Sequence, residues 1–465
     1  MKVLLVNPPH RFARGNPFAR AGLALPPLGL LHVAARLRES RPGVRVAVLD
    51  APALRLEGAA FERALAAAEP DLAGVSVYTG NYSSATAAGR ALKRLFPSCR
   101  TVAGGPHASL RPEETLAEGG FDAVVLGEGE ETFARLAAAW GDGGDPSAVP
   151  NLVLPGPRRT AADPAPLDLD RLPPPARDLL DPAPYRPSHG GYRRLPVASL
   201  VSSRGCPYAC RFCSKAVFGA RWRAQSPERT FSELRTLADE GWREASFQDD
   251  VFTFDRERTL RLCARLGSAR LDLTWTCMTR VDRVDAELLR AMAAAGCVSI
   301  AYGMESGDPE VLARMGKGLR PEDARAALAW TRAAGIESRA YYVLGHPGES
   351  EASLRRTVEE AVRADPDFVF FSFAFPIPGT PLYDEARAAG LLLRDGRELY
   401  DTADFTEPVL RVGAWGPAEL NAFVRKAYRR FYLRPRCVLR RLAALRSPSE
   451  LARAVSGALS VLRSS

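Results

Sequence analysis

The sequence predicts an α/β protein with an N-terminal, doubly wound, Rossmann-like parallel sheet and a C-terminal, partial (β/α)6, TIM-like barrel. Short apolar runs alternate with helical patterns twice along the chain, and such alternation is typical of parallel sheets covered by helices. A stretch rich in proline and glycine separates the two series. We therefore expect a first domain at 1–140, a linker at 141–191, a barrel at 192–412 and a basic helical extension at 413–465.

Length and composition favour a multidomain protein of a reducing compartment. The 465 residues allow two or three domains, each with its own core. Eight cysteines are too few for a disulfide scaffold in a chain of this length. The first residues read as an apolar strand and a turn rather than a signal peptide, and no run reaches the roughly 18 apolar residues of a membrane span. We expect a cytoplasmic protein.

The first 140 residues carry five strand-like runs. They are Lys2–Val6, Val44–Asp50, Leu72–Tyr78, Thr101–Ala103 and Ala123–Leu126, with helical patterns at Leu28–Glu39, Glu57–Ala68, Ser83–Leu95 and Glu131–Trp140. In open parallel sheets the ligand binds at the carboxyl ends of the strands. Here those ends are small or polar, at Asn7–Pro9, Asp50, Thr79–Tyr82, Gly104–Ser109 and Gly127–Glu130. No Gly-x-Gly-x-x-Gly follows the first strand, and the Gly127 segment lacks the lysine of a phosphate loop.

A second series of strands follows the linker. The strands are Pro196–Ser202, Glu244–Phe247, Leu273–Met278, Val298–Gly303, Ser338–Leu344 and Phe368–Phe375. Six parallel strands with right-handed crossovers would form a partial barrel. The linker, rich in proline, glycine and aspartate, predicts a segment that runs over the surface.

Basic residues concentrate in the C-terminal tail. Between Arg425 and Arg463 there are eleven Lys and Arg residues and one acid, Glu450, although the whole chain has a formal net charge of only +9. A solvated helix on the rim of the protein would explain this tail. Leucines and a valine interleave with the arginines, at Leu433, Val438, Leu439, Leu442 and Leu445, so a helix on a membrane surface is the alternative. Nucleic acid is not expected as a partner, because no motif for it accompanies the charge.

Three closely spaced cysteines are the most specific chemical feature. Cys206, Cys210 and Cys213 have the spacing CxxxCxxC, with Phe212 directly before the last one. Three thiolates can hold three irons of a 4Fe-4S cluster and leave the fourth iron open to a ligand. A structural zinc site would need a fourth ligand, and a ferredoxin module would need a fourth cysteine in the run. The other five cysteines lie singly among apolar neighbours and read as buried residues.

Polar residues follow the barrel strands. The strand ends carry Gln248–Asp250, Thr279–Arg280, Glu305–Ser306, Gly345–Glu349 and Pro376–Thr380. Catalytic loops lie at this end of a barrel, and an inward charge there must find a partner.

These strings resemble the radical S-adenosylmethionine (SAM) family, in particular its large cobalamin-binding class. The match covers the cysteine motif, Phe247–Phe252 (FQDDVF), Gly303–Gly307 (GMESG) and Leu344–Glu349 (LGHPGE). The resemblance implies that SAM chelates the open iron. It places Asp249 or Asp250 near the methionyl end of SAM or the substrate as the catalytic carboxylates. It also implies SAM contacts by Phe212, Arg280, Glu305, Ser306 and Gly345, with Arg280 suited to the SAM carboxylate.

The first domain resembles the cobalamin-binding domain that precedes the radical SAM core in this class. The matching strings are Asn7–Pro9, Pro26–Leu31, Gly104–His107 and Gly127–Glu131. The resemblance implies cobalamin contacts by Tyr78, Gly104, Gly105, His107, Gly127 and Glu128. One departure from methionine-synthase-like domains is that Ala-Pro-Ala-Leu-Arg follows Asp50, so the Asp-x-His-x-x-Gly histidine that binds cobalt is missing.

The resemblance implies an enzyme that cleaves SAM reductively to a 5′-deoxyadenosyl radical. The expected task is methylation of an unactivated carbon, or of phosphorus, in a biosynthetic intermediate. Oxidative cyclisation or ring rearrangement without methyl transfer is the alternative, and a non-catalytic sensor with a cluster and cobalamin is a third reading. The expected partners are a small molecule, for which the amphipathic tail favours an apolar compound, and an electron donor such as flavodoxin or ferredoxin. Peripheral membrane contact would come through the tail.

Overall fold

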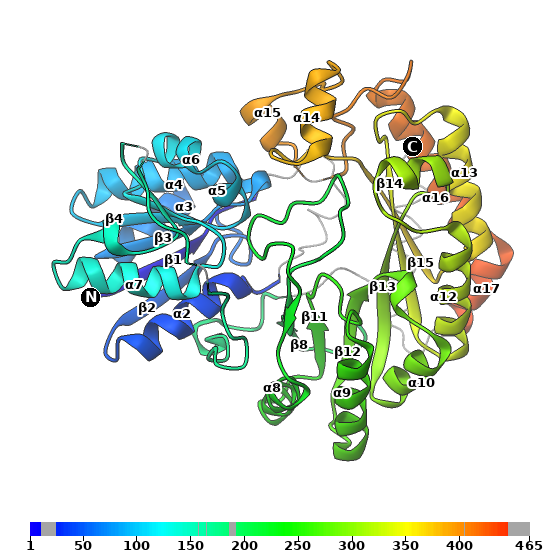
Figure 1. The fold of residues 1–465 in the computed structure, drawn as a ribbon, viewed down its shortest axis with the longest axis horizontal. Coiled ribbons are helices and arrows are strands. Elements are labelled where there is room, and N and C mark those ends of the chain that lie inside the picture. Colours follow the sequence, from blue (N-terminus) through cyan, green and yellow to red (C-terminus); the bar gives the residue numbers. More distant parts are fainter. Residues whose placement is uncertain (11–24, 157, 164, 186–191, 404, 445–465) are drawn as a thin grey trace.

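The computed structural model describes residues 1–10, 25–156, 158–163, 165–185, 192–403 and 405–444. The molecule has two sheets, the first mostly parallel and the second fully parallel, and the predicted α/β fold class is confirmed (Figure 1). The first sheet has the order β2-β1-β3-β4-β5-β6-β7. Its strands are β1 (Lys2–Asn7), β2 (Arg45–Asp50), β3 (Leu72–Ser76), β4 (Arg100–Gly104), β5 (Ala123–Val125), β6 (Leu152–Leu154) and β7 (Arg158–Arg159).

Helices cover both faces of the first sheet (Figure 1). They are α2 (Leu28–Ser40), α3 (Gly58–Ala68), α4 (Tyr82–Leu95), α5 (Pro106–Leu110), α6 (Pro112–Gly119) and α7 (Glu130–Gly141). Strands β1 to β5 pair in parallel, whereas β6 and β7 pair antiparallel, with Val124 opposite Val153. The linker therefore does more than run over the surface, because its strands β6 and β7 extend the first sheet.

The second sheet is parallel throughout and has the order β15-β14-β13-β12-β11-β8, which makes an open, partial barrel. Its strands are β8 (Val197–Leu200), β11 (Glu244–Phe247), β12 (Thr274–Thr279), β13 (Cys297–Glu305), β14 (Glu337–Leu344) and β15 (Phe368–Phe373). The helices on its outer side are α8 (Pro227–Asp239), α9 (Arg256–Ala269), α10 (Ala286–Ala294), α11 (Pro309–Arg314), α12 (Pro321–Ala333) and α13 (Glu351–Ala364).

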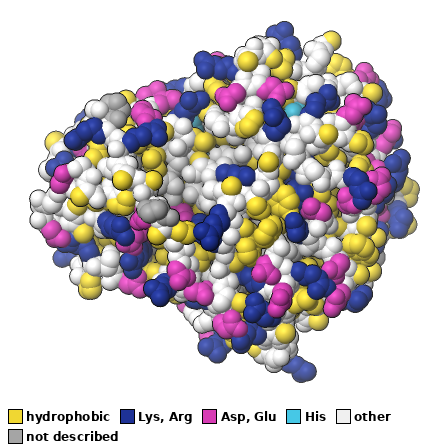
Figure 2. All heavy atoms as spheres, viewed as in Figure 1, with side chains coloured by type: hydrophobic (Ala, Val, Ile, Leu, Met, Phe, Trp, Pro, Cys, Tyr) yellow, Lys and Arg dark blue, Asp and Glu magenta, His cyan; other side chains and the backbone are white. Residues whose placement is uncertain are grey.

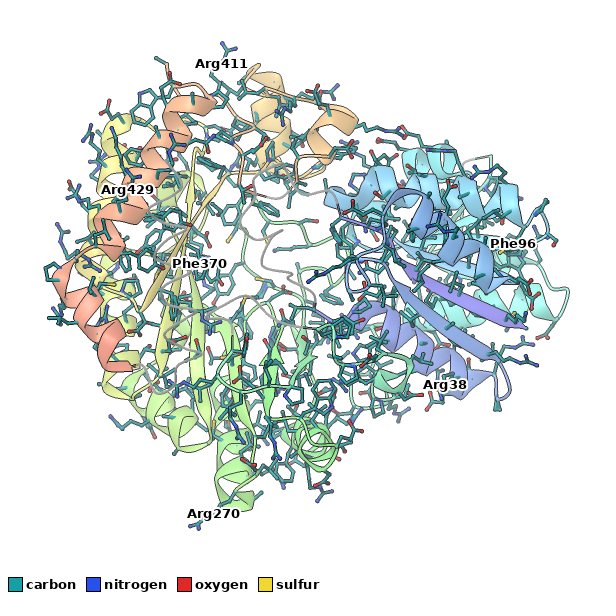
Figure 3. All side chains as sticks on the ribbon, turned by 180° about the vertical axis from the view of Figure 1, so that it is seen from behind. Arg38, Phe96, Arg270, Phe370, Arg411 and Arg429 are labelled. Atoms are coloured by element: carbon teal, nitrogen blue, oxygen red, sulfur yellow. The ribbon has the colours of Figure 1, made fainter. Side chains whose placement is uncertain are left out.

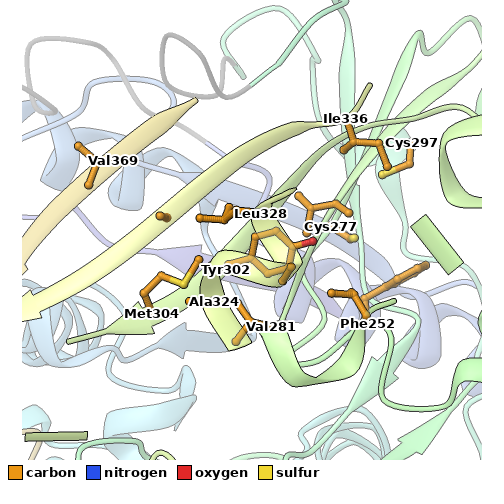
Figure 4. Close-up of a cluster of buried hydrophobic side chains, with 14 of the residues drawn as sticks. Phe252, Cys277, Val281, Cys297, Tyr302, Met304, Ala324, Leu328, Ile336 and Val369 are labelled. Atoms are coloured by element: carbon orange, nitrogen blue, oxygen red, sulfur yellow. The ribbon is translucent and has the colours of Figure 1, made fainter. Parts of the chain in front are cut away.

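Alternate residues of each barrel strand pack against these helices. Tyr302 of β13 is fully buried, and its hydroxyl lies 2.8 Å from Oγ1 of Thr331 on α12. Figure 4 shows Tyr302 and Met304 packed with Ala324 and Leu328 of α12 in this layer. Because successive side chains point to opposite faces of a strand, the residues between them face the barrel interior.

Two C-terminal segments pack in different places. Helices α14 (Pro381–Ala388) and α15 (Gly396–Tyr400) join the hydrophobic core of the first domain, where Leu382 and Tyr400 meet Tyr82 and Leu92 of α4. Helices α16 (Pro417–Tyr432) and α17 (Pro435–Ala444) pack on the outside of β15 and α13. Figure 3 shows α16 with Arg429 on the side of the barrel away from the first domain. Part of the expected barrel segment thus belongs to the core of the first domain.

Candidate active site

A cavity of about 390 Å³ lies between the carboxyl edge of the first sheet and the cysteine loop of the barrel. The wall on the first-domain side includes His32, Gly74, Tyr78, Gly104, Gly105, Gly127 and Glu128. The wall on the barrel side includes Arg204, Cys206, Cys213, Lys215, Phe218 and Asp250. The cavity is therefore lined both by residues expected to contact cobalamin and by cysteines expected to hold the iron–sulfur cluster.

Glycine backbones shape the first-domain wall. A Cβ on Gly74 would lie 2.9 Å from side-chain atoms of both Leu5 and Phe133. Gly105 has φ +105°, and a Cβ there would lie 3.0 Å from the carbonyl oxygen of Val77. Glycine at these positions therefore leaves room for the neighbouring protein atoms that form the wall. The imidazole of His32 also lines this wall, and its Nδ1 is buried without a hydrogen-bond partner. The wall fits a large cofactor such as a corrinoid.

The loop after β2 offers no ligand for cobalt. Asp50 is buried, and its carboxylate accepts hydrogen bonds from Asn7 Nδ2 at 2.9 Å and from the Tyr185 hydroxyl at 2.8 Å. The carboxylate is thus committed to holding the linker against the first sheet. A bound corrinoid would have no histidine from this loop, as the sequence indicates.

His107 lies outside the cavity wall, contrary to the expectation that it contacts the cofactor. It is fully buried in α5, with Nδ1 at 3.1 Å from Oγ1 of Thr79. Its ring packs between Tyr82 and Tyr400, each with a centroid distance of 4.6 Å. Burial, followed by the nearby Arg111 cation, lowers the pKa of His107 to about 4. The residue is part of the contact between the first domain and α15.

The three cysteines lie on a loop held between the short strands β9 (Ser203–Arg204) and β10 (Arg223–Ala224). Gly205 has φ +87°, and a Cβ there would overlap the carbonyl oxygen of Arg221, so only glycine fits this turn. Cys206 and Cys210 are half-buried and Cys213 is exposed where the loop meets the cavity. Burial raises the pKa of the Cys210 thiol, and the Lys317 and Arg280 cations oppose that rise.

The arrangement of these thiols fits a cluster better than a single metal ion. The loop carries three thiols, whereas a structural zinc ion takes four protein ligands. A 4Fe-4S cluster takes each thiolate on a different iron, so its cysteines need not meet at one point. The donor set therefore favours the cluster over the zinc alternative, with Cys206, Cys210 and Cys213 as the residues that would hold it.

Of the two aspartates after β11, Asp250 alone faces the cavity. The carboxylate of Asp249 accepts hydrogen bonds from the Ser202 backbone at 2.8 Å, the Ser202 hydroxyl at 2.7 Å and the Ser203 hydroxyl at 2.6 Å. Asp249 is fully buried, so it positions the strand that leads into the cysteine loop. Burial and the Asp249 charge raise the pKa of Asp250. Asp250 is the better candidate for contact with SAM or substrate.

Arg280 at the end of β12 is buried beside the cysteine loop. Its guanidinium binds Asp282 at 2.8 and 3.0 Å and the Lys317 carbonyl at 2.9 Å, and it lies 3.7 Å from the centre of the Tyr208 ring. Its Nη1 is buried without a partner. The two N–H donors of Nη1 therefore remain for an added carboxylate, which fits the contact with SAM that the resemblance implies.

Glu305 at the end of β13 is buried and forms an ion pair with Lys317, with Nζ to Oε1 at 2.7 Å. Its φ of +62° is a conformation that costs a residue with a side chain about 1 kcal/mol or more. Such strain concentrates at functional positions. No sequence signal indicated Lys317, because it lies in the loop after α11 and meets Glu305 only in the folded barrel.

Three other predicted contacts support the surrounding loops. Ser306 is buried with its hydroxyl 3.0 Å from Oγ1 of Thr357 on α13. The amide of Gly345 donates to Glu349 at 2.6 Å within the turn after β14. Phe212 packs against the hydrophobic core that the first domain shares with α14 and α15 and lies outside the cavity wall. The structure gives these residues positioning contacts.

Comparison with known proteins matches this layout in both halves. Residues 17–137 match the B12 binding domain model, and residues 200–361 match the radical SAM superfamily model. An uncharacterized methyltransferase of Pyrococcus horikoshii is 32% identical over 95% of this chain and 94% of its own length. The chain belongs to the cobalamin-dependent radical SAM enzymes.

Further relatives of this radical SAM enzyme act on different compounds. The anaerobic magnesium-protoporphyrin IX monomethyl ester cyclase of Rubrivivax gelatinosus is 26% identical over 78% of this chain and 66% of its own length. The hopanoid C-3 methylase of Methylococcus capsulatus is 29% identical over 86% and 75%. The fold resembles the radical SAM methyltransferase TsrM of Kitasatospora setae, solved with cobalamin and a 4Fe-4S cluster, with a TM-score of 0.68, 23% identity and coverage of 85% and 76%.

The cofactors of this family are a 4Fe-4S cluster, SAM and cobalamin. When bound, they supply a 5′-deoxyadenosyl radical by reductive cleavage of SAM and a carrier for a methyl group. The chain supplies the thiols of Cys206, Cys210 and Cys213, the Nη1 amino group of Arg280 and a cavity shared by the two domains. Asp250 adds a carboxylate to that wall, between the two cofactor sites.

Proposed function

We propose that this enzyme transfers a methyl group to an unactivated carbon, or to phosphorus, of an apolar biosynthetic intermediate. One observation carries the proposal: Cys206, Cys213 and Asp250 share a single cavity with Gly74, Gly105 and the other glycines of the first domain. Methyl transfer between a corrinoid and a substrate radical needs the two sites to open onto one space that excludes water.

The experiment is anaerobic reconstitution of the full chain with iron, sulfide and hydroxocobalamin. We expect a brown protein that releases 5′-deoxyadenosine from SAM, and we expect Cys210→Ala to abolish that release. Cys263→Ala is the matched control, because Cys263 is buried in the barrel core between α9 and its neighbours. SAM labelled in its methyl group should transfer the label to product. Release of 5′-deoxyadenosine without transfer of the label would contradict methylation.

Oxidative cyclisation is the second candidate, favoured by the similarity to the magnesium-protoporphyrin IX monomethyl ester cyclase. A cyclised product of unchanged carbon count, with no label from SAM, would identify it. Both candidates need an electron donor, for which we propose a flavodoxin or a ferredoxin. Replacing dithionite with reduced flavodoxin should sustain the release of 5′-deoxyadenosine.

The inner face of the barrel supports an apolar substrate. Phe371 contacts Tyr428 of α16, so its neighbour Phe370 faces inward, where Tyr341 stacks on it with a centroid distance of 4.8 Å. Tyr341 and Met278 expose more than a third of their surface there. Figure 2 shows hydrophobic side chains gathered in the hollow between the two domains. The compounds named for two relatives, a porphyrin and a hopanoid, agree in class with such a surface.

The basic tail supports peripheral contact with a membrane that holds such a substrate. Leu433, Val438 and Leu439 are exposed on and beside α17, whereas the side chain of Leu442 and residue Leu445 lie outside what the structure describes. No helix in the described ranges is long and apolar enough to cross a membrane. We expect the full chain to float with anionic liposomes and the double variant L433Q/L439Q to lose that binding. Leu393→Gln, on another exposed leucine, is the control.

A further inference from the structure

Two arginines of the cysteine hairpin and two glutamates of the first domain form an ion cluster between the domains. Arg204 Nη1 lies 2.6 Å from Glu128 Oε1, and Arg204 Nη2 lies 2.7 Å from Glu130 Oε1. Arg223 Nη2 lies 2.8 Å from the second oxygen of Glu128. We name Arg204, Arg223, Glu128 and Glu130 the Arg204 clasp. The side chain of Arg204 is only 4% exposed and that of Glu130 only 6%.

The Arg204 clasp lies directly between the two cofactor sites. On one side, only Gly205 separates Arg204 from Cys206, and Gly205 fits its turn without room for a side chain. On the other side, Glu128 follows Gly127, whose backbone lines the cavity at the end of the first sheet. Arg204, Glu128 and Glu130 are themselves part of the cavity wall. A shift of either loop therefore has to move the other.

Stability alone does not explain so many buried charges at this place. Removing a charged group from water costs several kcal/mol, and apolar side chains of similar volume often replace a buried ion pair without loss. A guanidinium that binds two carboxylates at once, however, fixes the distance and angle between the loops that carry them. The Arg204 guanidinium also lies 5.2 Å from the centre of the Phe218 ring, which further restricts its orientation. The Arg204 clasp is suited to setting geometry.

We propose that the residues of the Arg204 clasp are positioning residues that hold the cluster-bearing loop over the corrinoid cavity, so that the two cofactor sites are energetically coupled. A formed cluster fixes the loop of Cys206. Through their ion pairs, Arg204 and Arg223 then hold Glu128 and Glu130 in place, so the corrinoid binds a wall that is already ordered. By linkage, a bound corrinoid favours the cluster site to the same degree. The proposal rests on both cofactors binding and does not require methyl transfer.

The test is a titration of the full chain with hydroxocobalamin, followed by absorbance, before and after anaerobic reconstitution of the cluster. We expect the wild-type chain to bind hydroxocobalamin at least about five-fold more tightly with the cluster in place, the lower end of common coupling factors. Arg204→Lys keeps the charge and loses the two-carboxylate geometry, and Glu130→Gln keeps the volume. Each should reduce the ratio of affinities to about one.

The matched control is Arg177→Lys, which alters the ion pair between the linker and α8 at 3.0 Å from Glu233, outside the wall of this cavity. It should leave the ratio unchanged. A merely structural loss would weaken both affinities equally and keep their ratio, and that result with Arg204→Lys would overturn the proposal. Equal affinities in the wild-type chain would overturn it without any variant, even if the variants fail to fold. No binding of hydroxocobalamin at all would instead contradict the cobalamin site.

Discussion

At the scale of single residues, neighbours with the same side chain have different tasks. Asp249 and Asp250 are adjacent in sequence. The Asp249 carboxylate accepts hydrogen bonds from Ser202 and Ser203, whereas Asp250 faces the cavity. The sequence places both at a strand end and offers no means of telling them apart. Their difference depends on the direction in which each side chain points after β11 ends at Phe247, and only the folded structure shows that direction.

We expect Asp249→Asn to lower the free energy of unfolding by about 2–4 kcal/mol, because it weakens three hydrogen bonds to a buried charge. Asp250→Asn should change stability by less than about 1 kcal/mol, since only one backbone hydrogen bond and a raised pKa are involved. Denaturant unfolding of the two variants measures both values. Asp250→Asn should also reduce the release of 5′-deoxyadenosine or the tightness of SAM binding. Equal loss of stability in both variants would contradict this assignment.

Glycines of the cavity wall provide a second prediction at this scale. Gly105→Ala should cost about 2 kcal/mol or more, because φ is +105° and the new Cβ would lie 3.0 Å from the Val77 carbonyl. Gly120→Ala is the control: its φ is also positive, at +62°, but a Cβ there meets nothing within 4 Å. We expect about 1 kcal/mol for the control. Only Gly105→Ala should weaken hydroxocobalamin binding, as measured by absorbance.

At the scale of elements, strands and motifs could be predicted and the contacts between distant segments could not. The alternation of apolar runs predicts β1 to β5 and the six barrel strands, because burial on both faces leaves a clear pattern. The short strands β6 and β7 lie in a proline-rich stretch and form only because β5 offers a free edge. The packing of α15 on α4 likewise has no local signal. The contact of His107 with Tyr400 of α15 could not be expected from the sequence for the same reason.

Asp365 pairs with several arginines of the tail helices, which allows a test of how these helices are held. Asp365 follows α13 with φ +50° and accepts ion pairs from Arg434 at 2.9 Å and Arg440 at 3.0 Å, with Arg436 at 3.6 Å. Asp365→Asn keeps the side chain that best tolerates this backbone conformation and removes the charge. We expect a loss of about 2–4 kcal/mol in the free energy of unfolding, since these three arginines and Arg332, at 3.2 Å, lose an acidic partner, although Arg440 keeps Asp367 at 3.5 Å.

The control for Asp365→Asn is Glu359→Gln, which removes a single exposed pair with Arg430 at 3.6 Å and should cost less than about 1 kcal/mol. Hydrogen exchange should show faster exchange of α17 amides in Asp365→Asn alone, with hydroxocobalamin binding unchanged. Unchanged exchange of the α17 amides in Asp365→Asn would mean that apolar contacts such as those of Phe431 and Cys437 hold these helices without the charges.

At the scale of the whole molecule, two sheets meet through three kinds of contact. The Arg204 clasp joins the hairpin to the first domain, the hydrophobic packing of α14 and α15 joins the end of the barrel to α4, and the Asp50–Tyr185 hydrogen bond holds the linker. Of these contacts, the Arg204 clasp lies in the wall of the cavity. The family resemblance in the sequence predicts both cofactors, but the residues that bring their sites together come from segments far apart in the chain.

The contact around His107 makes the stability of the whole molecule depend on pH. The pKa of His107 falls to about 4 in the folded protein, against about 6.5 in an unfolded chain. Between these values the unfolded state binds the proton and the folded state does not, so the free energy of unfolding decreases as pH falls from about 6.5 to about 4. Its contribution is complete above pH 6.5, and about 3 kcal/mol is lost by pH 4.

His107→Phe keeps a ring between Tyr82 and Tyr400 and removes the titration, so its unfolding should depend less on pH over this range. Thr79→Val removes the hydrogen bond to Nδ1 but keeps the imidazole, and it should retain the wild-type pH dependence at a lower overall stability. Denaturant unfolding at pH 5 and pH 7 separates the two, and equal pH dependence in wild type and His107→Phe would show that this imidazole is protonated in the folded protein.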